Sequence, residues 1–397
     1  MKRLGPELVH DTHEAHRALR ADGGVHEVVL PNGLRSWIVT GYELARAVLA
    51  DGRLSKDRDR TIELVQRHQT DGESTAQART PLSAHMLNAD PPDHTRLRKL
   101  VGKEFTTRRM EGLRERVREI TGELLDDMDR HDEVDLLPAF AFPLPITVIC
   151  ELLGVPLSDR ETFREWSTTL VSSVPPAQVQ EAAVAMAGYF TELIAHKRAN
   201  PDDALLSGLV RVSEDGDRLS EGELVSMMFL LLVAGHETTV NLIGNGVLAL
   251  LRHPDQFAAL RADPSLLPGA VEELLRYDSP VNLTTLRYTT EPITLEGQRI
   301  PADDLVVVAL TSANRDADRF AEADRLDVTR AAAGHLAFGH GIHHCVGAPL
   351  ARMEGEIAIG ALLERFPKIT LAAEPDELRR RASSLMHGLE ALPVRLR

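Results

Sequence analysis

Cysteines and long apolar runs are both scarce in this sequence of 397 residues. Its longest apolar run, residues 227–235, is far shorter than the roughly 20 residues that cross a bilayer. Residues 1–20 are polar and charged and lack the apolar core of a signal peptide. Two cysteines, Cys150 and Cys345, are too few for a disulfide framework and are typical of a reducing compartment. The sequence therefore predicts a cytoplasmic protein without a membrane anchor.

Positive charge is also in deficit, because 45 lysines and arginines face 60 acidic residues and leave a net charge of -15. A nucleic-acid-binding protein needs a basic face, so this balance argues against a nucleic-acid partner. Apolar residues make up 43% of the chain, enough to enclose a large core together with a cofactor. The length would allow two or three average domains, but larger single domains exist. We expect one domain over residues 1–397.

The most informative stretch is residues 338–347, a short glycine-rich loop that precedes a helical pattern at 348–366. Cys345 lies at the start of that helix, where positive backbone potential stabilises a thiolate. Gly341 and Gly347 allow a tight loop that presents N–H groups toward the sulfur. A multi-cysteine zinc site is excluded, since no second cysteine lies nearby. Cys345 is therefore predicted to be a nucleophile or a metal ligand; the alternative is a buried, inert cysteine.

The pattern of this loop, Phe-x-x-Gly-x-His-x-Cys-x-Gly from Phe338 to Gly347, resembles the haem-binding loop of cytochrome P450 monooxygenases. The resemblance implies haem b as cofactor, with Cys345 as the axial thiolate ligand of the iron. It also implies the fold class, mainly α with small β-sheets. In that fold the haem lies between a long central distal helix and the proximal helix that follows the cysteine loop.

Residues 93–105 form a predicted helix with two basic faces. At 100° per residue, His94 and Arg98 share a face with the apolar residues Val101 and Phe105. An unpaired cation that points inward is costly, and a buried anion would explain it. The resemblance assigns His94 and Arg98 to the haem propionates. The alternative is a solvated helix start.

Other matched positions complete the cofactor site that the resemblance implies. Arg287 and His343 are further propionate partners, although an exposed strand is the alternative for Arg287. The remaining cofactor-binding positions lie in the cysteine loop and in the central helix: Ala234, Phe338, Gly341 and Gly347.

Residues 221–252 are predicted to form a long central helix, because Ser220 and Glu223 make a capping box at its start. Its middle reads Ala-Gly-His-Glu-Thr-Thr at residues 234–239, where the small residues leave space for a flat or bulky group. Polar groups inside an apolar helix are costly unless they are used. The motif resembles the distal helix of the same family, which implies that Glu237 and Thr238 deliver protons to activated oxygen. The alternative is a core helix with one satisfied threonine.

An acid and a base, Glu273 and Arg276, share one face of a later predicted helix. Such a pair is commonly a surface salt bridge. The resemblance instead places them, together with Arg325, in a buried structural network beside the haem.

The resemblance also implies a covered substrate pocket, with residues 57–84 and two helices at 162–174 and 177–197 as its cover. The candidate pocket residues are mostly apolar and favour a bulky lipophilic substrate; they are Met86, Leu87, Leu170, Val171, Val233, Val281, Asn282, Leu283, Thr284 and Met386.

The expected function is a monooxygenase of secondary metabolism that uses O2 and acts on polyketides such as macrolides, or on related lipophilic molecules. The expected electron donors are a ferredoxin and its reductase. A basic docking patch is predicted at Arg96, Lys99, Lys103, Arg108, Arg109 and Arg352, although ordinary surface charge is the alternative. The alternative functions are a peroxide-driven peroxygenase and a haem-based sensor or carrier.

Overall fold

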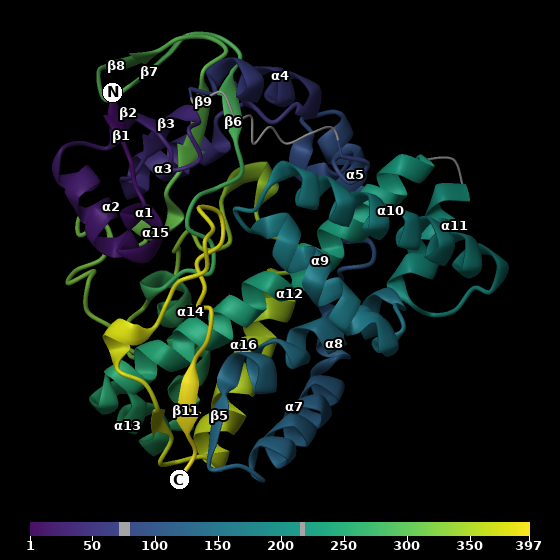
Figure 1. Cartoon of the computed structure of the whole chain (residues 1–397), viewed down its shortest axis with the longest axis vertical. Coiled ribbons are helices and arrows are strands. Elements are labelled where there is room, and N and C mark those ends of the chain that lie inside the picture. The colour runs from purple at the N-terminus through teal and green to yellow at the C-terminus, as the bar shows by residue number, and fades with distance from the viewer. Residues whose placement is uncertain (71–79, 215–218) are drawn as a thin grey trace.

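Helices dominate the computed structural model, which describes residues 1–70, 80–214 and 219–397 (Figure 1). The α-helices of these residues are α1 (Glu7–His10), α2 (Thr12–Ala21), α3 (Tyr42–Ala50), α4 (Arg58–His68), α5 (Asp93–Gly102), α6 (Thr107–Glu111), α7 (Arg114–Met128), α8 (Pro143–Leu153), α9 (Arg160–Val171), α10 (Pro176–Ala199), α11 (Leu205–Glu214), α12 (Glu221–Arg252), α13 (Pro254–Ala262), α14 (Leu267–Tyr277), α15 (Leu310–Ala313) and α16 (Ala348–Arg365).

The strands of the described residues form three small sheets. The largest has the order β1-β2-β3-β9-β6-β4 and is built from β1 (Lys2–Arg3), β2 (Val25–Val29), β3 (Arg35–Val39), β9 (Leu305–Val308), β6 (Arg287–Thr289) and β4 (Leu54–Ser55). A three-stranded sheet joins β10 (Thr370–Leu371), β11 (Pro393–Arg395) and β5 (Glu133–Asp135), and a two-stranded one joins β7 (Ile293–Leu295) and β8 (Gln298–Ile300). The predicted class of mainly α structure with small sheets is confirmed.

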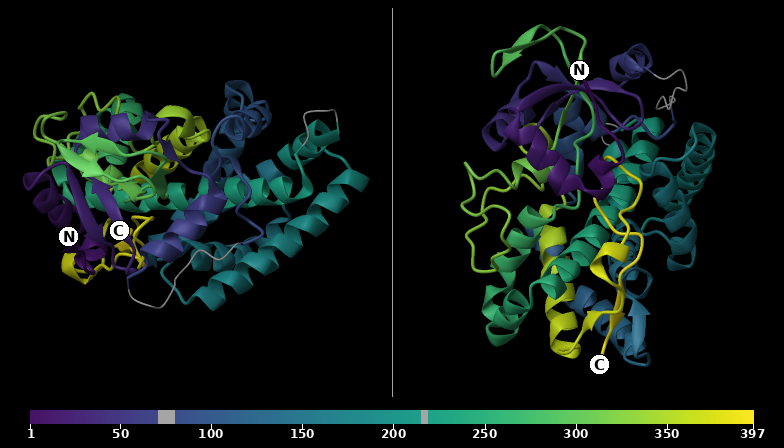
Figure 2. Two further views of the ribbon diagram at one scale, coloured as in Figure 1. Left: turned by 90° about the horizontal axis from the view of Figure 1, so that it is seen from above. Right: turned by 60° about the vertical axis from the view of Figure 1, so that its left-hand side comes forward.

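Helix α12 runs through the body of the protein (Figure 2). It begins at the predicted capping box, in which the Glu223 amide donates to Ser220 Oγ at 3.2 Å and the Ser220 amide donates to Glu223 Oε2 at 2.7 Å. Its length and composition would allow it to cross a membrane, but 78% of its most apolar window is buried inside the protein. That burial is typical of a core helix.

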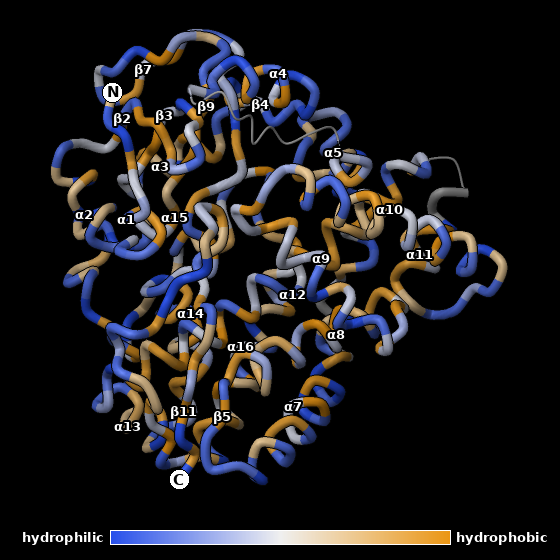
Figure 3. Tube along the Cα trace, in the orientation of Figure 1, coloured by the Kyte–Doolittle hydropathy of each residue, from blue (hydrophilic) through white to orange (hydrophobic). Residues whose placement is uncertain are grey.

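The largest hydrophobic core surrounds α12 and includes residues of α7, α8, α10 and α16. Figure 3 shows the origin of this packing in α7, where apolar and polar residues alternate along the helix. The apolar side chains Val117, Ile120 and Leu125 are buried. Burial of such helix faces is the main stabilising contribution, at about 25 cal/mol per Å² of apolar surface.

Some sequence-based boundaries differ from the structure. The β-rich run at residues 306–310 was predicted to be a strand, but β9 ends at Val308 and Leu310 begins α15. The two predicted cover helices are present as α9 and α10, which are separated near Pro175. Helix α4 occupies part of the predicted cover at 57–84. Residues 71–79 of that predicted cover lie outside the described part of the chain.

Candidate functional site

A cavity of about 300 Å³ lies between α12 and the cysteine loop. Its walls come from α5, the middle of α12, the segment around β6, the loop at 337–347 and the first turns of α16. Most of its lining residues are apolar, and its polar groups gather at the cysteine loop and around β6. A concave, mostly apolar cavity with a few convergent polar groups is the usual form of a ligand site.

The cysteine loop closes one side of this cavity, and Phe338, Cys345 and Gly347 line it, whereas Gly341 does not. The Cys345 amide donates to Phe338 O at 2.9 Å, which ties the loop into a turn. Gly341 has a φ of +73°, and an added Cβ there would lie 2.8 Å from Leu49 O, so only glycine fits. The turn therefore holds the sulfur at the start of α16, as the sequence predicted.

Cys345 is exposed and lines the cavity, where the surrounding protein still desolvates its sulfur. Burial raises its pKa, while the amides of Gly347 and Ala348 and the cations Arg98 and Arg352 act in the opposite direction. The two amides and the two arginines favour the thiolate form of Cys345 once a metal cation binds the sulfur. Cys150 differs, because burial within α8 raises its pKa to about 12 and it packs as an inert core residue.

Four predicted anion partners, His94, Arg98, Arg287 and His343, meet at the cavity wall. The rings of His94 and His343 are in contact with centroids 4.5 Å apart, and His94 Nε2 is buried without a hydrogen-bond partner. Burial, and then the neighbouring cation Lys56, lower the pKa of His343 to about 2, so it is a neutral donor.

Arg287 is buried, and burial lowers its pKa to about 10, so it remains a cation at neutral pH. Among the described residues, no hydrogen bond or ion pair satisfies its guanidinium. An unpaired buried cation and an unpaired buried imidazole nitrogen both call for an anion. The residues present therefore fit a flat apolar cofactor with carboxylate substituents and an iron that binds sulfur, as the resemblance implies.

The opposite wall is the middle of α12, where Ala234, Gly235 and Thr238 line the cavity. Thr238 Oγ1 donates to Ala234 O at 2.9 Å, within the same helix. A Cβ on Gly235 would lie 2.9 Å from the Ile149 side chain of α8, so this glycine also permits close helix packing. The small residues predicted to leave space at this point do leave it.

Glu237, which was predicted to deliver protons together with Thr238, does not lie in the cavity lining. Glu237 is buried, its Oε2 accepts a hydrogen bond from Arg381 Nη1 at 2.7 Å, and its Oε1 lies 3.6 Å from His236 Nε2. Burial acts to raise the pKa of Glu237, but contacts with His236 and Arg381 outweigh it and hold the pKa at about 2. Glu237 is therefore an anion fixed beside Arg381.

A second acid, Glu354, was not predicted from the sequence. It lies on α16 and lines the cavity, and its side chain contacts Thr239. Burial raises its pKa to about 8, so Glu354 is protonated and able to donate at neutral pH. The signal in the sequence is an acid within the apolar face of the helix at 348–366.

The predicted pair of Glu273 and Arg276 is present and completely buried. Arg276 Nε and Nη2 donate to the two carboxylate oxygens at 2.7 and 2.8 Å. The predicted third member, Arg325, is wrong, because its exposed side chain pairs with Glu322. Arg330 takes that place and donates from Nε to Glu273 Oε1 at 3.1 Å.

Replacement of Glu273 with glutamine is expected to lower the free energy of unfolding by about 3 to 5 kcal/mol, because it leaves two cations uncompensated in the interior. Urea denaturation of the purified protein measures this loss. The matched control is Glu322→Gln, which removes an exposed carboxylate paired with Arg325 and should change stability by less than about 1 kcal/mol. Equal effects of the two substitutions would contradict the assignment.

Half of the residues predicted for the substrate pocket lie in the cavity lining. Met86, Leu87, Val281, Thr284 and Met386 line the cavity. The others do not, because they pack elsewhere or serve as hydrogen-bond partners in the core: Leu170, Val171, Val233, Asn282 and Leu283.

The predicted basic docking patch is reduced by ion pairs. Arg96 pairs with Glu223, Arg109 with Glu104, and Arg352 with Glu272, and a paired arginine offers little net charge to a partner. The remaining three members are exposed on or near α5 and α6: Lys99, Lys103 and Arg108.

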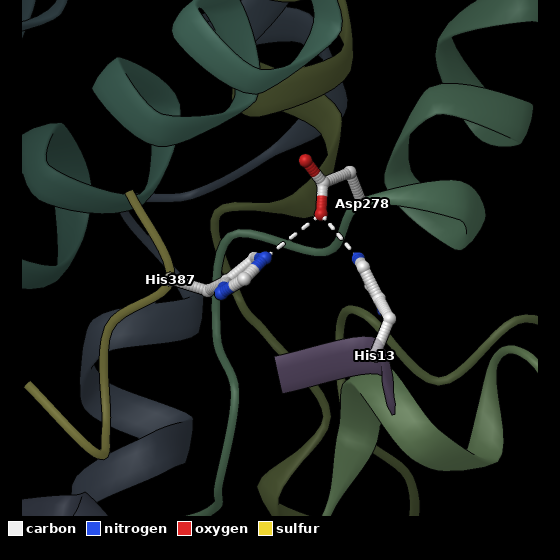
Figure 4. A group of neighbouring side chains, drawn as sticks. All are labelled: His13, Asp278 and His387. Atoms are coloured by element: carbon white, nitrogen blue, oxygen red, sulfur yellow. Dashed lines mark hydrogen bonds and ion pairs between the residues drawn. The ribbon is translucent and has the colours of Figure 1, made fainter. Parts of the chain in front are cut away.

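A separate cluster joins distant segments of the chain. His13 and His387 each direct Nε2 toward Asp278 Oδ1, at 2.9 and 2.8 Å (Figure 4). Their ligand atoms are close enough to hold a metal ion. However, Arg380 donates to Asp278 Oδ2 at 2.9 Å, and its positive charge disfavours a cation there. We interpret this cluster as a structural tie between α2, the end of α14 and the C-terminal segment.

This tie predicts a pH dependence of stability. Burial, followed by the charge of Arg315, lowers the pKa of His13 to about 3. Below about pH 6.5 the unfolded chain takes up a proton at His13 that the folded protein excludes. The part of the unfolding free energy that depends on neutral His13 is therefore fully present above about pH 6.5 and is lost as the pH falls toward 3. His13→Gln should reduce the fall in unfolding free energy between pH 6.5 and 5 by up to about 1.4 kcal/mol per pH unit. Identical pH slopes for both proteins in urea denaturation would refute this.

Comparisons with known proteins agree on one family. A sequence profile described as "Cytochrome P450" matches residues 177–387. The chain is 56% identical over 385 residues to "Cytochrome P450 107B1" of Saccharopolyspora erythraea, which covers 97% of this chain and 95% of that protein. It is 52% identical over 398 residues to "Cytochrome P450 monooxygenase PikC" of Streptomyces venezuelae, with coverages of 99% and 93%. The solved structure of the tirandamycin C-bound P450 monooxygenase TamI superposes with a TM-score of 0.94 at 51% identity, over 100% of both chains.

Proposed function

The chain belongs to the cytochrome P450 family and is a haem-dependent monooxygenase of secondary-metabolite tailoring, and from this we propose that it inserts one oxygen atom of O2 into a bulky lipophilic molecule held in the cavity. The observation that carries this proposal is the arrangement of the cavity walls. A single cysteine thiol, a group of uncompensated donors and cations, and a mostly apolar α12 wall that includes Thr238 and Thr239 all line the same space.

The cysteine loop and the cations hold the cofactor in this proposal. Cys345 binds the iron as a thiolate, and the two carboxylates of the haem pair with His94, Arg98, Arg287 and His343. Charge-assisted hydrogen bonds of this kind are about twice as strong as neutral ones. When bound, haem with a thiolate ligand supplies the reductive activation of O2.

The chain itself must supply protons at the α12 wall. Thr238 Oγ1 is placed to hold a water in the cavity, because its hydroxyl retains an acceptor site while it donates to Ala234 O. Glu354 is a protonated acid in the cavity lining. Glu237 acts by position, since its ion pair with Arg381 fixes the C-terminal segment against α12.

The substrate class follows from the shape and polarity of the cavity. Met86, Leu87, Val281 and Met386 present apolar surface beside the α12 wall, which suits a lipophilic molecule rather than a charged one. Tirandamycin C is bound in the related enzyme TamI. We infer that the substrate of this chain is a polyketide or a similarly bulky molecule. Hydroxylation of an unactivated C–H bond is the expected reaction, and epoxidation is the second outcome.

An optical titration of the ferric protein tests this function. Macrolides, other polyketides, terpenoids and steroids are added in turn, and a shift of the Soret band from the low-spin to the high-spin form identifies a ligand that displaces the water beside the iron. The expected result is a shift with at least one bulky lipophilic compound, followed by product formation with NAD(P)H, a ferredoxin and its reductase. Product formation with peroxide alone would instead support a peroxygenase, and an intact haem without turnover would support a sensor or carrier.

The electron donors in this proposal are a ferredoxin and its reductase, in the cytoplasm. Lys99, Lys103 and Arg108 are exposed on or near α5 and α6, and α5 also carries His94 and Arg98 of the cavity wall. An acidic ferredoxin would meet complementary charge there. The double substitution Lys99→Glu and Lys103→Glu should slow electron transfer at low ionic strength, and salt should reduce the difference. A rate that depends on neither salt nor these charges would exclude this surface.

A further inference from the structure

Lys56 is a buried lysine at the cavity wall that the sequence did not single out. It follows β4 directly, is 3% exposed, and lines the cavity together with Thr285 and Arg287. Its Nζ donates to Thr285 Oγ1, and among the described residues this ammonium has no carboxylate within ion-pair distance. A lysine buried in this way is rare unless it is paired.

The sheet register explains why this lysine reaches the cavity. Strands β4 and β6 are antiparallel, with Ser55 opposite Tyr288. One residue further along, Lys56 comes next to Arg287, and burial, followed by the charge of Arg287, lowers the pKa of the lysine. Like charges on neighbouring strands destabilise a sheet. Two adjacent buried cations therefore need an anion in common.

Positively charged side chains outnumber carboxylates at this wall of the cavity. The cations Lys56, Arg98 and Arg287 face the cavity, whereas the carboxylate whose charge acts on Lys56 and Arg287 is Asp90. Asp90 is already engaged, because it accepts hydrogen bonds from Ser55 Oγ and from the Lys56 amide. Three cations against one carboxylate leave two positive charges in excess, which equals the charge of the two propionates of a haem.

We propose that Lys56 is a further cofactor-binding residue, whose ammonium pairs with a haem propionate beside Arg287. The inference rests on the proposed haem-thiolate function. The ammonium has three N–H groups and gives one to Thr285, so two are available to a carboxylate. Thr285 fixes the direction of the lysine side chain, and the propionate removes the repulsion between the two cations. Lys56 therefore contributes to the retention of haem and to the potential of its iron.

The test uses the haem-loaded protein and the variant Lys56→Gln, which keeps a polar side chain and removes the charge. The first readout is the rate at which haem passes to an excess of apomyoglobin. Loss of one charge-assisted hydrogen bond should make this transfer about ten times faster or more. The second readout is the reduction potential, which should move to more negative values because removal of a nearby cation favours the ferric state. The matched control is Lys368→Gln, because Lys368 is exposed and lies outside the cavity lining.

The possible outcomes separate this inference from the proposed function. Faster haem transfer and a lower potential for Lys56→Gln, with Lys368→Gln unchanged, support the pairing. A variant that retains haem like the wild type at an unchanged potential overturns it, while the haem-thiolate function stands. An altered substrate affinity with unchanged haem transfer also overturns it, because Lys56 would then face the substrate. A wild-type protein without haem would refute the proposed function itself. Lys56→Met repeats the test with an apolar side chain of similar length, so that one misfolded variant does not decide the result.

Discussion

Replacement of Cys345 with serine is expected to abolish monooxygenation and to remove the thiolate signature from the optical spectrum of the haem. The expected loss is the largest that any single substitution would produce, with turnover below detection. The reason is chemical, since a serine hydroxyl at neutral pH is neither an anion nor a soft sulfur donor. The ferrous carbon monoxide spectrum and the rate of product formation measure the two effects.

The geometry of the loop makes this prediction specific to Cys345. The Cys345 amide is held by Phe338 O, and Gly341 allows the loop to pass close to Leu49, so the position of the β-carbon should be unchanged in the variant. The matched control is Cys150→Ser, at the other cysteine of the chain, which lies within α8 and outside the cavity lining. This control should lose some stability and keep the thiolate spectrum. A thiolate spectrum in Cys345→Ser would refute the assignment of the ligand.

Replacement of Thr238 with alanine is expected to uncouple electron consumption from product formation. Product formation should fall by about 10² to 10⁴, while NAD(P)H oxidation continues and the electrons appear as hydrogen peroxide. The physical reason is that the hydroxyl of Thr238 lies in the α12 wall, where it is placed to steer a proton into the cavity. The measurement is the ratio of product and peroxide to NAD(P)H consumed.

The structural cost of this substitution should be small. Thr238 Oγ1 donates only to Ala234 O of its own helix, and that carbonyl keeps its helical partner when the hydroxyl is removed. Haem content and substrate-induced spectral shifts should therefore match the wild type. Thr238→Ser is the matched control, since it retains the hydroxyl and should stay coupled. Unchanged coupling in Thr238→Ala would show that the proton arrives by another route, with Glu354 as the next group to replace.

The parts of this site that the sequence predicted are those encoded over short distances along the chain. The cysteine loop is a contiguous pattern, and the capping box at Ser220 fixes the start of α12 within four residues. Glu273 and Arg276 lie three residues apart on one helix, so helical spacing was enough to pair them.

The parts that the sequence did not predict depend on contacts between distant segments. The partner of Glu237 could not be predicted, because Arg381, which donates to its carboxylate, lies 144 residues away. Arg330 replaced Arg325 because the chain turns after α14 in a way that helical spacing cannot predict. Lys56 reaches the cavity only through the pairing of β4 with β6, and its hydrogen-bond partner lies 229 residues further along the chain.

The central claim is that Cys345 is the axial ligand of the haem iron. A histidine of the same cavity is the alternative ligand. His94, His340, His343 and His344 also line the space that Cys345 faces, and an imidazole can bind haem iron. The decisive measurement is the spectrum of the reduced wild-type protein under carbon monoxide. A Soret band at the long-wavelength position typical of thiolate ligation is the predicted result. A band at the shorter wavelength typical of imidazole ligation would contradict the account.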